Sequence, residues 1–186
     1  MKVIVLKREF SHEFTSSVDS AIIPDSAIVK DRKPFFVPPI DNHWGYHLAL
    51  AFRISRLGKN IQSRFAYRYV DAMTTAIVTR PLTIDIEQCS NGLHWTYEGT
   101  LMLGEWQPLP TDEKAPITVN MLNKTFAISN EISTLYEEIA HVSKFATLKM
   151  GDMIISGMTK IGEDLPLETC IQCELNSTEA LYFKIK

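Results

Sequence analysis

The sequence lacks most of the residue patterns that mark specialised protein classes. Its 186 residues include only three cysteines and eight glycines, and they form no glycine-rich phosphate loop, dinucleotide fingerprint or nucleophile elbow. No apolar run approaches the roughly 18 residues that a membrane-spanning helix needs. No internal repeat or low-complexity linker divides the chain. We therefore expect one domain over residues 1–186, with 45% hydrophobic residues to build its core.

The sequence also has no excess of positive charge. Nineteen Lys and Arg residues stand against 22 Asp and Glu residues, for a net charge of −3. This balance gives no electrostatic reason to expect a nucleic-acid partner or an anionic membrane surface. The apolar segment Met1–Leu6 is followed at once by Lys7 and is too short for a secretory signal. We expect a cytoplasmic protein that binds neither nucleic acid nor membrane.

The three cysteines predict free thiols rather than a disulfide framework. Their number is odd and no export signal accompanies them, which favours a reducing compartment. Cys170 and Cys173 have the spacing of a redox or zinc pair, but residues three apart on a strand point to opposite faces. Cys89 alone does not supply a second ligand pair. We interpret the pair as ordinary strand cysteines and keep a zinc or redox pair as the alternative.

Apolar and polar residues alternate in several segments, which predicts a protein rich in strands. Apolar positions spaced by the helical period predict one helix in the last third of the chain, capped by Ser129 or Ser133. Strands are expected over residues 2–6, 46–55 and 73–79, hairpins about Asn123 and Asn176-Ser177, and helix-face residues at Ile132, Leu135, Ile139 and Val142.

Two histidines, His43 and His47, are four residues apart. On a helix such a pair is a plausible zinc clamp. The surrounding alternation indicates a strand, however, where residues four apart are about 13 Å from each other and cannot share an ion. We therefore expect His47 to fill a pocket, and a rebuilt zinc site centred on it is the alternative.

Four segments together resemble the fumarylacetoacetate hydrolase family, in particular proteins of the 2-hydroxyhepta-2,4-diene-1,7-dioate isomerase and acylpyruvate hydrolase type. They are Pro24–Pro38, Leu50–Ala72, Leu103–Trp106 and Val142–Gly157. The resemblance implies a mixed, β-rich (α+β) fold like the family's C-terminal domain, a β-sandwich or β-roll with a few short helices. It also implies a reaction at C–C bonds of 2-oxo acids that depends on Mg²⁺ or Mn²⁺.

The residues that bind the metal in this family are replaced here. The family motif has Glu-x-Glu-Leu-Ala, then Gly-Lys-Asn, then an Asp, and the ungapped register places its three carboxylates on His47, Ala49 and Val78. Mg²⁺ requires several oxygen ligands at about 2.0–2.1 Å, and a methyl or isopropyl group offers none. We therefore expect no metal cofactor.

The other functional positions of the family are altered too. The base-bearing Asn-Tyr-x-x-His element falls on Glu9, Phe10 and Glu13, and a Lys that meets the substrate carboxylate falls on Ile23. A second Lys is lost with about four residues between Trp95 and Leu103. In place of Thr-Gly-Thr-Pro the chain has Ser156, Gly157, Met158 and Thr159. The pocket-lining candidates are His47, Ala49, Val78, Ser156, Gly157 and Met158.

These substitutions favour a family member without catalysis, acting as a binding or partner protein. The resemblance implies a homodimer, or a hetero-oligomer with an active relative. Two alternatives remain open at this point. One is a metal-dependent hydrolase, isomerase or decarboxylase of acylpyruvate-like 2-oxo acids that works from a relocated site. The other is a metal-free binder of a small apolar ligand in the vacated pocket.

Overall fold

A computed structural model describes residues 1–186 except 31–32, 84–92, 160–164 and 166. The described part contains one α-helix, α1 (Glu131–Phe145), and three short 3₁₀ helices, η1 (Asp25–Ala27), η2 (Ser63–Arg68) and η3 (Leu93–Trp95). Its strands are β1 (Lys2–Leu6), β2 (Ser20–Pro24), β3 (Ile28–Val29), β4 (Trp44–Ile54), β5 (Val70–Pro81), β6 (Leu101–Leu103), β7 (Gln107–Pro108), β8 (Ile117–Met121), β9 (Lys124–Ile128), β10 (Met153–Met158), β11 (Cys170–Leu175) and β12 (Thr178–Lys184).

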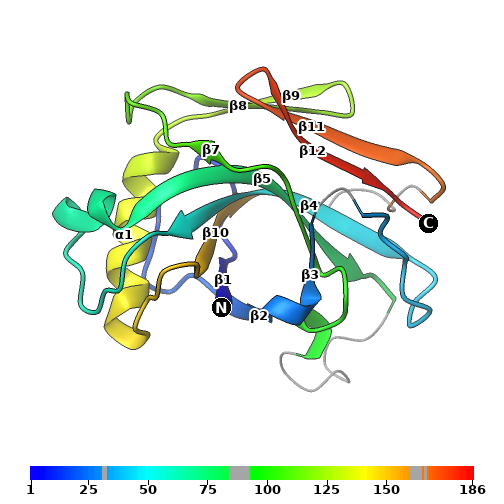
Figure 1. Ribbon diagram of the computed structural model, residues 1–186, viewed down its shortest axis with the longest axis horizontal. Helices are drawn as coiled ribbons and strands as arrows, with labels where there is room; N and C mark the ends of the chain where they lie inside the picture. Colours follow the sequence, from blue (N-terminus) through cyan, green and yellow to red (C-terminus); the bar gives the residue numbers. More distant parts are fainter. Residues whose placement is uncertain (31–32, 84–92, 160–164, 166) are drawn as a thin grey trace.

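These strands form two sheets. Among the described residues, the large sheet has the order β2-β1-β10-β4-β5-β6-β3, with β7 also paired to β5, and the small sheet has the order β12-β11-β8-β9. Figure 1 shows the small sheet lying over one face of the large sheet, with α1 beside it along the same face. The expected mixed, strand-rich fold is confirmed. No helix in the described part of the chain has the length and apolar character needed to span a bilayer.

Strands β4 and β5 form the central antiparallel pair of the large sheet. The pairing runs from Trp44 opposite Pro81 to Ile54 opposite Val70, and it places His47 directly opposite Val78. Most side chains of both strands are buried, including the threonines Thr74, Thr75 and Thr79 of β5. The strands expected over residues 46–55 and 73–79 are confirmed; β4 begins two residues earlier and ends one residue earlier than predicted, and β5 extends beyond both predicted limits.

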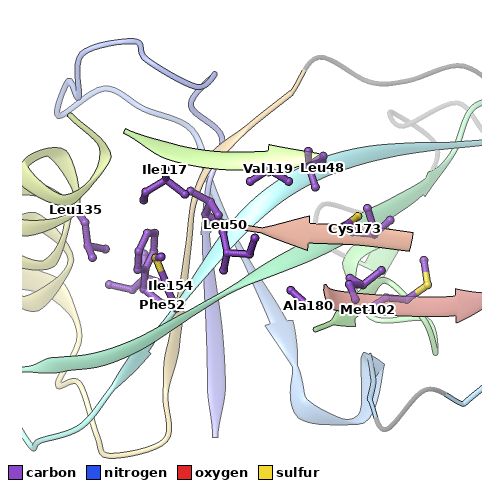
Figure 2. Close-up of a cluster of buried hydrophobic side chains, with 14 of the residues drawn as sticks. Leu48, Leu50, Phe52, Met102, Ile117, Val119, Leu135, Ile154, Cys173 and Ala180 are labelled. Carbon is purple, nitrogen blue, oxygen red and sulfur yellow. The ribbon is translucent and has the colours of Figure 1, made fainter. Parts of the chain in front are cut away.

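The alternation of side chains along β4 divides the core into two clusters. Leu48, Leu50 and Phe52 point toward α1 and the small sheet, where they meet residues such as Leu135 and Val119 (Figure 2). Ala49 and Ala51 point to the opposite face and belong to a second apolar cluster. Fully burying one large apolar side chain stabilises the fold by about 1.5–3 kcal/mol, so the first cluster anchors the layers to each other.

Helix α1 follows the predicted apolar period but starts differently from the prediction. Ile132, Leu135, Ile139 and Val142 are all buried, as expected. The expectation that Ser129 or Ser133 caps the helix is wrong. The N-cap is Asn130 in the left-handed conformation (φ 60°), and the Ser133 hydroxyl instead donates to the Asn130 carbonyl at 2.8 Å. Asparagine tolerates this conformation better than most residues, which explains its place here.

Both predicted hairpins are present. The β8–β9 turn places Leu122 and Asn123 at positive φ, and the β11–β12 turn does the same with Asn176 and Ser177. Two successive residues at positive φ match the right-handed twist of the adjoining strands.

The cysteines of β11 lie as ordinary strand residues. Cys170 is exposed, Cys173 is buried and both are free thiols. Their opposite exposure agrees with the predicted opposite faces. Cys89 lies outside the described residues. Burial raises the pKa of the Cys173 thiol to about 12, so this group is protonated at physiological pH.

A buried charged cluster joins β10, α1 and the segment after β1. The Arg8 guanidinium donates from Nε to Glu138 Oε1 at 2.9 Å and from Nη2 to both Glu131 Oε1 and the Ser156 hydroxyl. Ser156 in turn donates to Glu131 Oε1 at 2.8 Å. Arg8 is 4% exposed and Glu138 is fully buried. We call these four residues, Arg8, Glu131, Glu138 and Ser156, the buried charge cluster.

The buried charge cluster contains two carboxylates and one guanidinium. The second oxygens of Glu131 and Glu138 are buried without a hydrogen-bond partner among the described residues. Burial raises the pKa of Glu138 to about 7; Arg8 opposes this rise and Glu131 adds to it. A proton on Glu138 leaves one carboxylate paired with one guanidinium, which is the cheaper state in a low-dielectric interior.

This titration predicts that the protein loses stability as pH rises toward neutral. Since the folded pKa of Glu138 (about 7) lies above its ordinary value of 4.5, the folded state keeps a proton that the unfolded state releases between these values. The stabilisation that this proton gives is fully present below pH 4.5 and is lost as the pH rises through 7. The free energy of unfolding falls by up to roughly 3 kcal/mol over this range. Urea unfolding at pH 5 and pH 8 measures how much the free energy of unfolding changes with pH. This change should be smaller for Glu138→Gln than for the wild type. An equal pH dependence in Glu138→Gln and the wild type would contradict the assignment of this titration to Glu138. Glu137→Gln, on the exposed side of the helix, is the control.

The end of β10 depends on Gly157. The register with β4 shifts between Ser156 and Met158, and Gly157 has φ of +60°. A Cβ atom there would lie 2.7 Å from both Glu131 Oε1 and Phe10 Cδ1. Arg8 and Ser156 hold that carboxylate in place, so it cannot move away cheaply.

We expect Gly157→Ala to destabilise the protein by about 3 kcal/mol, because backbone strain and crowding add. Gly151 is the matched control, since it also has positive φ (+88°) but no atom within 4 Å of the added Cβ. Gly151→Ala should cost only the strain, about 1 kcal/mol. Chemical denaturation of both variants measures the two costs, and equal losses would show that Gly157 is not crowded by the buried charge cluster.

Candidate functional site

Four of the residues singled out from the sequence meet on one face of the large sheet. His47 on β4 lies opposite Val78 on β5, and Ala49 pairs with Met158 on β10. Ala49, Val78 and Met158 belong to the second apolar cluster, together with Ile23 of β2. The structure therefore brings together residues from widely separated parts of the sequence, from Ile23 to Met158.

The chemistry of this site does not suit Mg²⁺ or Mn²⁺. Ala49 and Val78 are fully buried and have no side-chain oxygen, and Met158 offers only a thioether. The remaining polar group, His47, uses Nδ1 in a 2.7 Å hydrogen bond with the Thr159 carbonyl. In the described part of the chain, no three His, Cys, Asp or Glu side chains are grouped so that they could hold a metal ion.

The other candidate positions lie around this site without completing it. Glu9 forms a β-bridge with Met158, and Glu13 is exposed. Ser156, expected to line the pocket, is fully buried on the opposite face, where its hydroxyl belongs to the buried charge cluster. Gly157 lies beside Glu131 of that cluster. Regular alternation would place Ser156 and Met158 on one face, but the register shift at Gly157 interrupts it, so Met158 lies opposite Ala49 and Ser156 opposite Leu50.

A cavity of about 1300 Å³ opens beside His47 and Met158. Its wall includes basic and imidazole side chains that the sequence reasoning missed, among them Lys7, Arg80 and His94. Arg80 could have been found from its position, because it lies two residues after Val78 on the same strand and so faces the same side. His94 lies on η3, directly before Trp95, and no sequence pattern indicated that it lines the cavity.

The imidazoles of His47 and His94 are influenced by the basic side chains of the cavity. Burial lowers the pKa of His47, the hydrogen bond to Thr159 opposes this, and the nearby Arg80 lowers it further. Burial also lowers the pKa of His94, with contributions from Lys7 and Arg80, while Asp19 raises it. Both imidazoles are therefore neutral at neutral pH.

The neutral tautomer of His47 follows from its hydrogen bond. A carbonyl oxygen only accepts, so Nδ1 carries the proton that it donates to Thr159. Nε2 then bears a lone pair, and no described residue bonds to it. Lys7 is already engaged, because it pairs with Asp19 and lies 5.2 Å from the centre of the Trp95 ring. The site thus offers one guanidinium and one hydrogen-bond acceptor to a ligand.

Comparison with known proteins identifies the family. The family model described as Fumarylacetoacetate (FAA) hydrolase C-terminal matches residues 13–180. No curated protein matches the chain.

Solved structures share the fold at low sequence identity. Fumarylpyruvate hydrolase from Pseudomonas aeruginosa in complex with Mn²⁺ and pyruvate has a TM-score of 0.80 at 14% identity, covering 100% of this chain and 89% of that one. 2-Hydroxyhepta-2,4-diene-1,7-dioate isomerase from Mycobacterium marinum has a TM-score of 0.82 at 15% identity, covering 99% and 73%. 5-Carboxymethyl-2-hydroxymuconate delta-isomerase from Mycobacterium smegmatis has a TM-score of 0.82 at 14% identity, covering 99% and 78%. Since the family model spans most of its length, the chain belongs to the fumarylacetoacetate hydrolase family.

Proposed function

We propose that this protein is a non-catalytic member of the family that works as a binding or partner protein without a metal ion. One observation supports the proposal above the others. Ala49 and Val78 lie where the family motif places carboxylate ligands, and both are fully buried within an apolar cluster. An ion placed there would lose its hydration shell and gain no oxygen ligand in return, which costs several kcal/mol.

The carboxylates elsewhere in the region do not support a relocated metal site. Glu131 and Glu138 are held by Arg8 on the other face of the sheet. Glu9 and Asp19 line the cavity, and Asp19 pairs with Lys7. Metal-dependent chemistry on 2-oxo acids needs at least two convergent oxygen ligands beside the substrate. This arrangement favours binding over metal-dependent hydrolysis, isomerisation or decarboxylation.

Equilibrium dialysis against Mn²⁺ tests the proposal. We expect no stoichiometric uptake at micromolar free Mn²⁺, because the motif positions lack oxygen ligands. The fumarylpyruvate hydrolase from Pseudomonas aeruginosa, whose structure contains Mn²⁺, is the positive control. Hydrolysis of acylpyruvates and decarboxylation of oxaloacetate should not exceed a blank that contains Mn²⁺ alone. Uptake of one Mn²⁺ per chain together with either activity would overturn the proposal.

The proposal includes self-association as a homodimer. Leu57, Phe145 and Met150 are 70%, 76% and 79% exposed, and all three flank the β-bridge between Gly58 and Leu148. Large apolar side chains gathered at one place on a surface are typical of an interface. A second copy of this chain is the occupant that we propose, and an active relative is the alternative that a pull-down would reveal.

Light scattering after size exclusion tests the dimer. We expect a mass of twice 21.1 kDa for the wild type and a shift toward the monomer for the double variant Phe145→Ser/Met150→Ser, which removes apolar contact area. Phe36→Ser is the control, since Phe36 is 65% exposed but lies in a different segment. A monomeric wild type, or equal effects of the double variant and the control, would contradict this interface.

A further inference from the structure

Arg80 is the one cavity-lining cation with no ion-pair partner among the described residues. It lies near the end of β5, two residues after Val78, and is only partly exposed. Its cross-strand partner is Gly45, which has no side chain to cover it. Lys7 is neutralised by Asp19, and Arg8 by the carboxylates of the buried charge cluster. Within the described part of the chain, Arg80 therefore brings to the cavity a positive charge that no ion pair neutralises.

The groups around Arg80 add hydrogen-bonding nitrogens and apolar surface to its positive charge. His47 and His94 lie close enough for the guanidinium to affect both imidazoles. His47 presents the unprotonated Nε2, and His94 has a buried Nδ1 with no partner among the described residues. Trp95 and Met158 add apolar surface to the same cavity. Together they form a site with one cation, hydrogen-bonding nitrogens and an apolar wall.

We propose that this cavity binds a small hydroxycarboxylate without a metal ion. The carboxylate lies on the guanidinium of Arg80, the ligand hydroxyl donates to Nε2 of His47, and the carbon skeleton lies against Trp95 and Met158. The planar fork of arginine matches a carboxylate with two parallel hydrogen bonds, and such charge-assisted bonds strengthen in a partly desolvated site. This inference deepens the proposed function and rests on it, since Arg80 supplies charge where relatives use a metal ion.

Two features make the site selective. A carboxylate has one negative charge, which Arg80 balances, whereas a phosphate dianion would exceed the charge available. The lone pair on Nε2 of His47 accepts a hydrogen bond from a ligand hydroxyl. A carboxylic acid without the hydroxyl leaves that acceptor unpaired. The sequence resemblance alone predicted that no side chain binds a ligand carboxylate. The reason is that the family's carboxylate-binding Lys position is Ile23 here, which is fully buried.

An NMR titration with 2-hydroxybutyrate, butyrate and inorganic phosphate tests this inference, with EDTA present throughout. The signals of the imidazole groups of His47 and His94 report binding at the site. We expect saturable shifts with 2-hydroxybutyrate, an affinity at least 5-fold weaker for butyrate, and none for phosphate. Arg80→Gln should weaken 2-hydroxybutyrate binding at least 10-fold, and Arg80→Lys should restore only part of it. Arg56→Gln removes the same charge from an exposed position and should change nothing.

The outcomes separate the inference from the proposed function. No saturable binding, equal affinity in Arg80→Gln and the wild type, or preference for phosphate would overturn the hydroxycarboxylate site, while the absence of metal uptake would still support a metal-free family member. Binding that appears only when Mn²⁺ replaces EDTA would overturn both. Binding in EDTA that depends on Arg80 and on the ligand hydroxyl supports the inference.

Discussion

The register between β4 and β5 is the constraint on which the candidate site depends. Because side chains alternate along a strand, this one register sets His47, Ala49, Val78 and Arg80 on the same face. A slip of one residue would move all of them to the face that packs against α1. The large apolar side chains of β4, including Leu50 and Phe52, fix the register, since they must stay in the first core cluster. The packing of one face therefore determines the chemistry presented on the other.

The two faces of the large sheet differ in chemical character. The face where the family motif places carboxylates carries the second apolar cluster, and His47 and Arg80 lie toward one end of it. The opposite face, packed against α1, contains Arg8 with two buried carboxylates. Breaking such a buried pair costs more than it contributes when intact. The cluster therefore holds α1 in place and keeps Glu131 and Glu138 away from the cavity.

Local sequence patterns predicted the strands, hairpins and helix, whereas contacts between distant parts of the chain determine the buried charge cluster. The strands, both hairpins and the apolar face of α1 follow from short periodicities that tertiary packing reinforces. The motif register also predicted a common site for His47, Ala49 and Val78, and the strand pairing places His47 opposite Val78 and Ala49 opposite Ala76. The buried charge cluster was missed because Arg8 and Glu131 are 123 positions apart. The seven-residue spacing of Glu131 and Glu138, in line with Leu135 and Val142, was the available signal that both face the core.

The start of α1 and the cavity show a second limit of sequence reasoning. The sequence reasoning chose the neighbouring serines as the cap because the left-handed turn, which favours Asn130, depends on how β9 approaches the helix. The position of His94 beside Arg80 likewise depends on how η3 packs against β2 and β5. Such features arise only after the sheets assemble, and they determine whether the vacated pocket is apolar or charged.

Anomalous diffraction at the Mn absorption edge, from crystals grown with Mn²⁺, tests the central claim most directly. The account predicts no anomalous peak near Ala49 and Val78, with apolar side chains in contact there. A peak in that hollow, coordinated by carboxylates from any part of the chain, would contradict it.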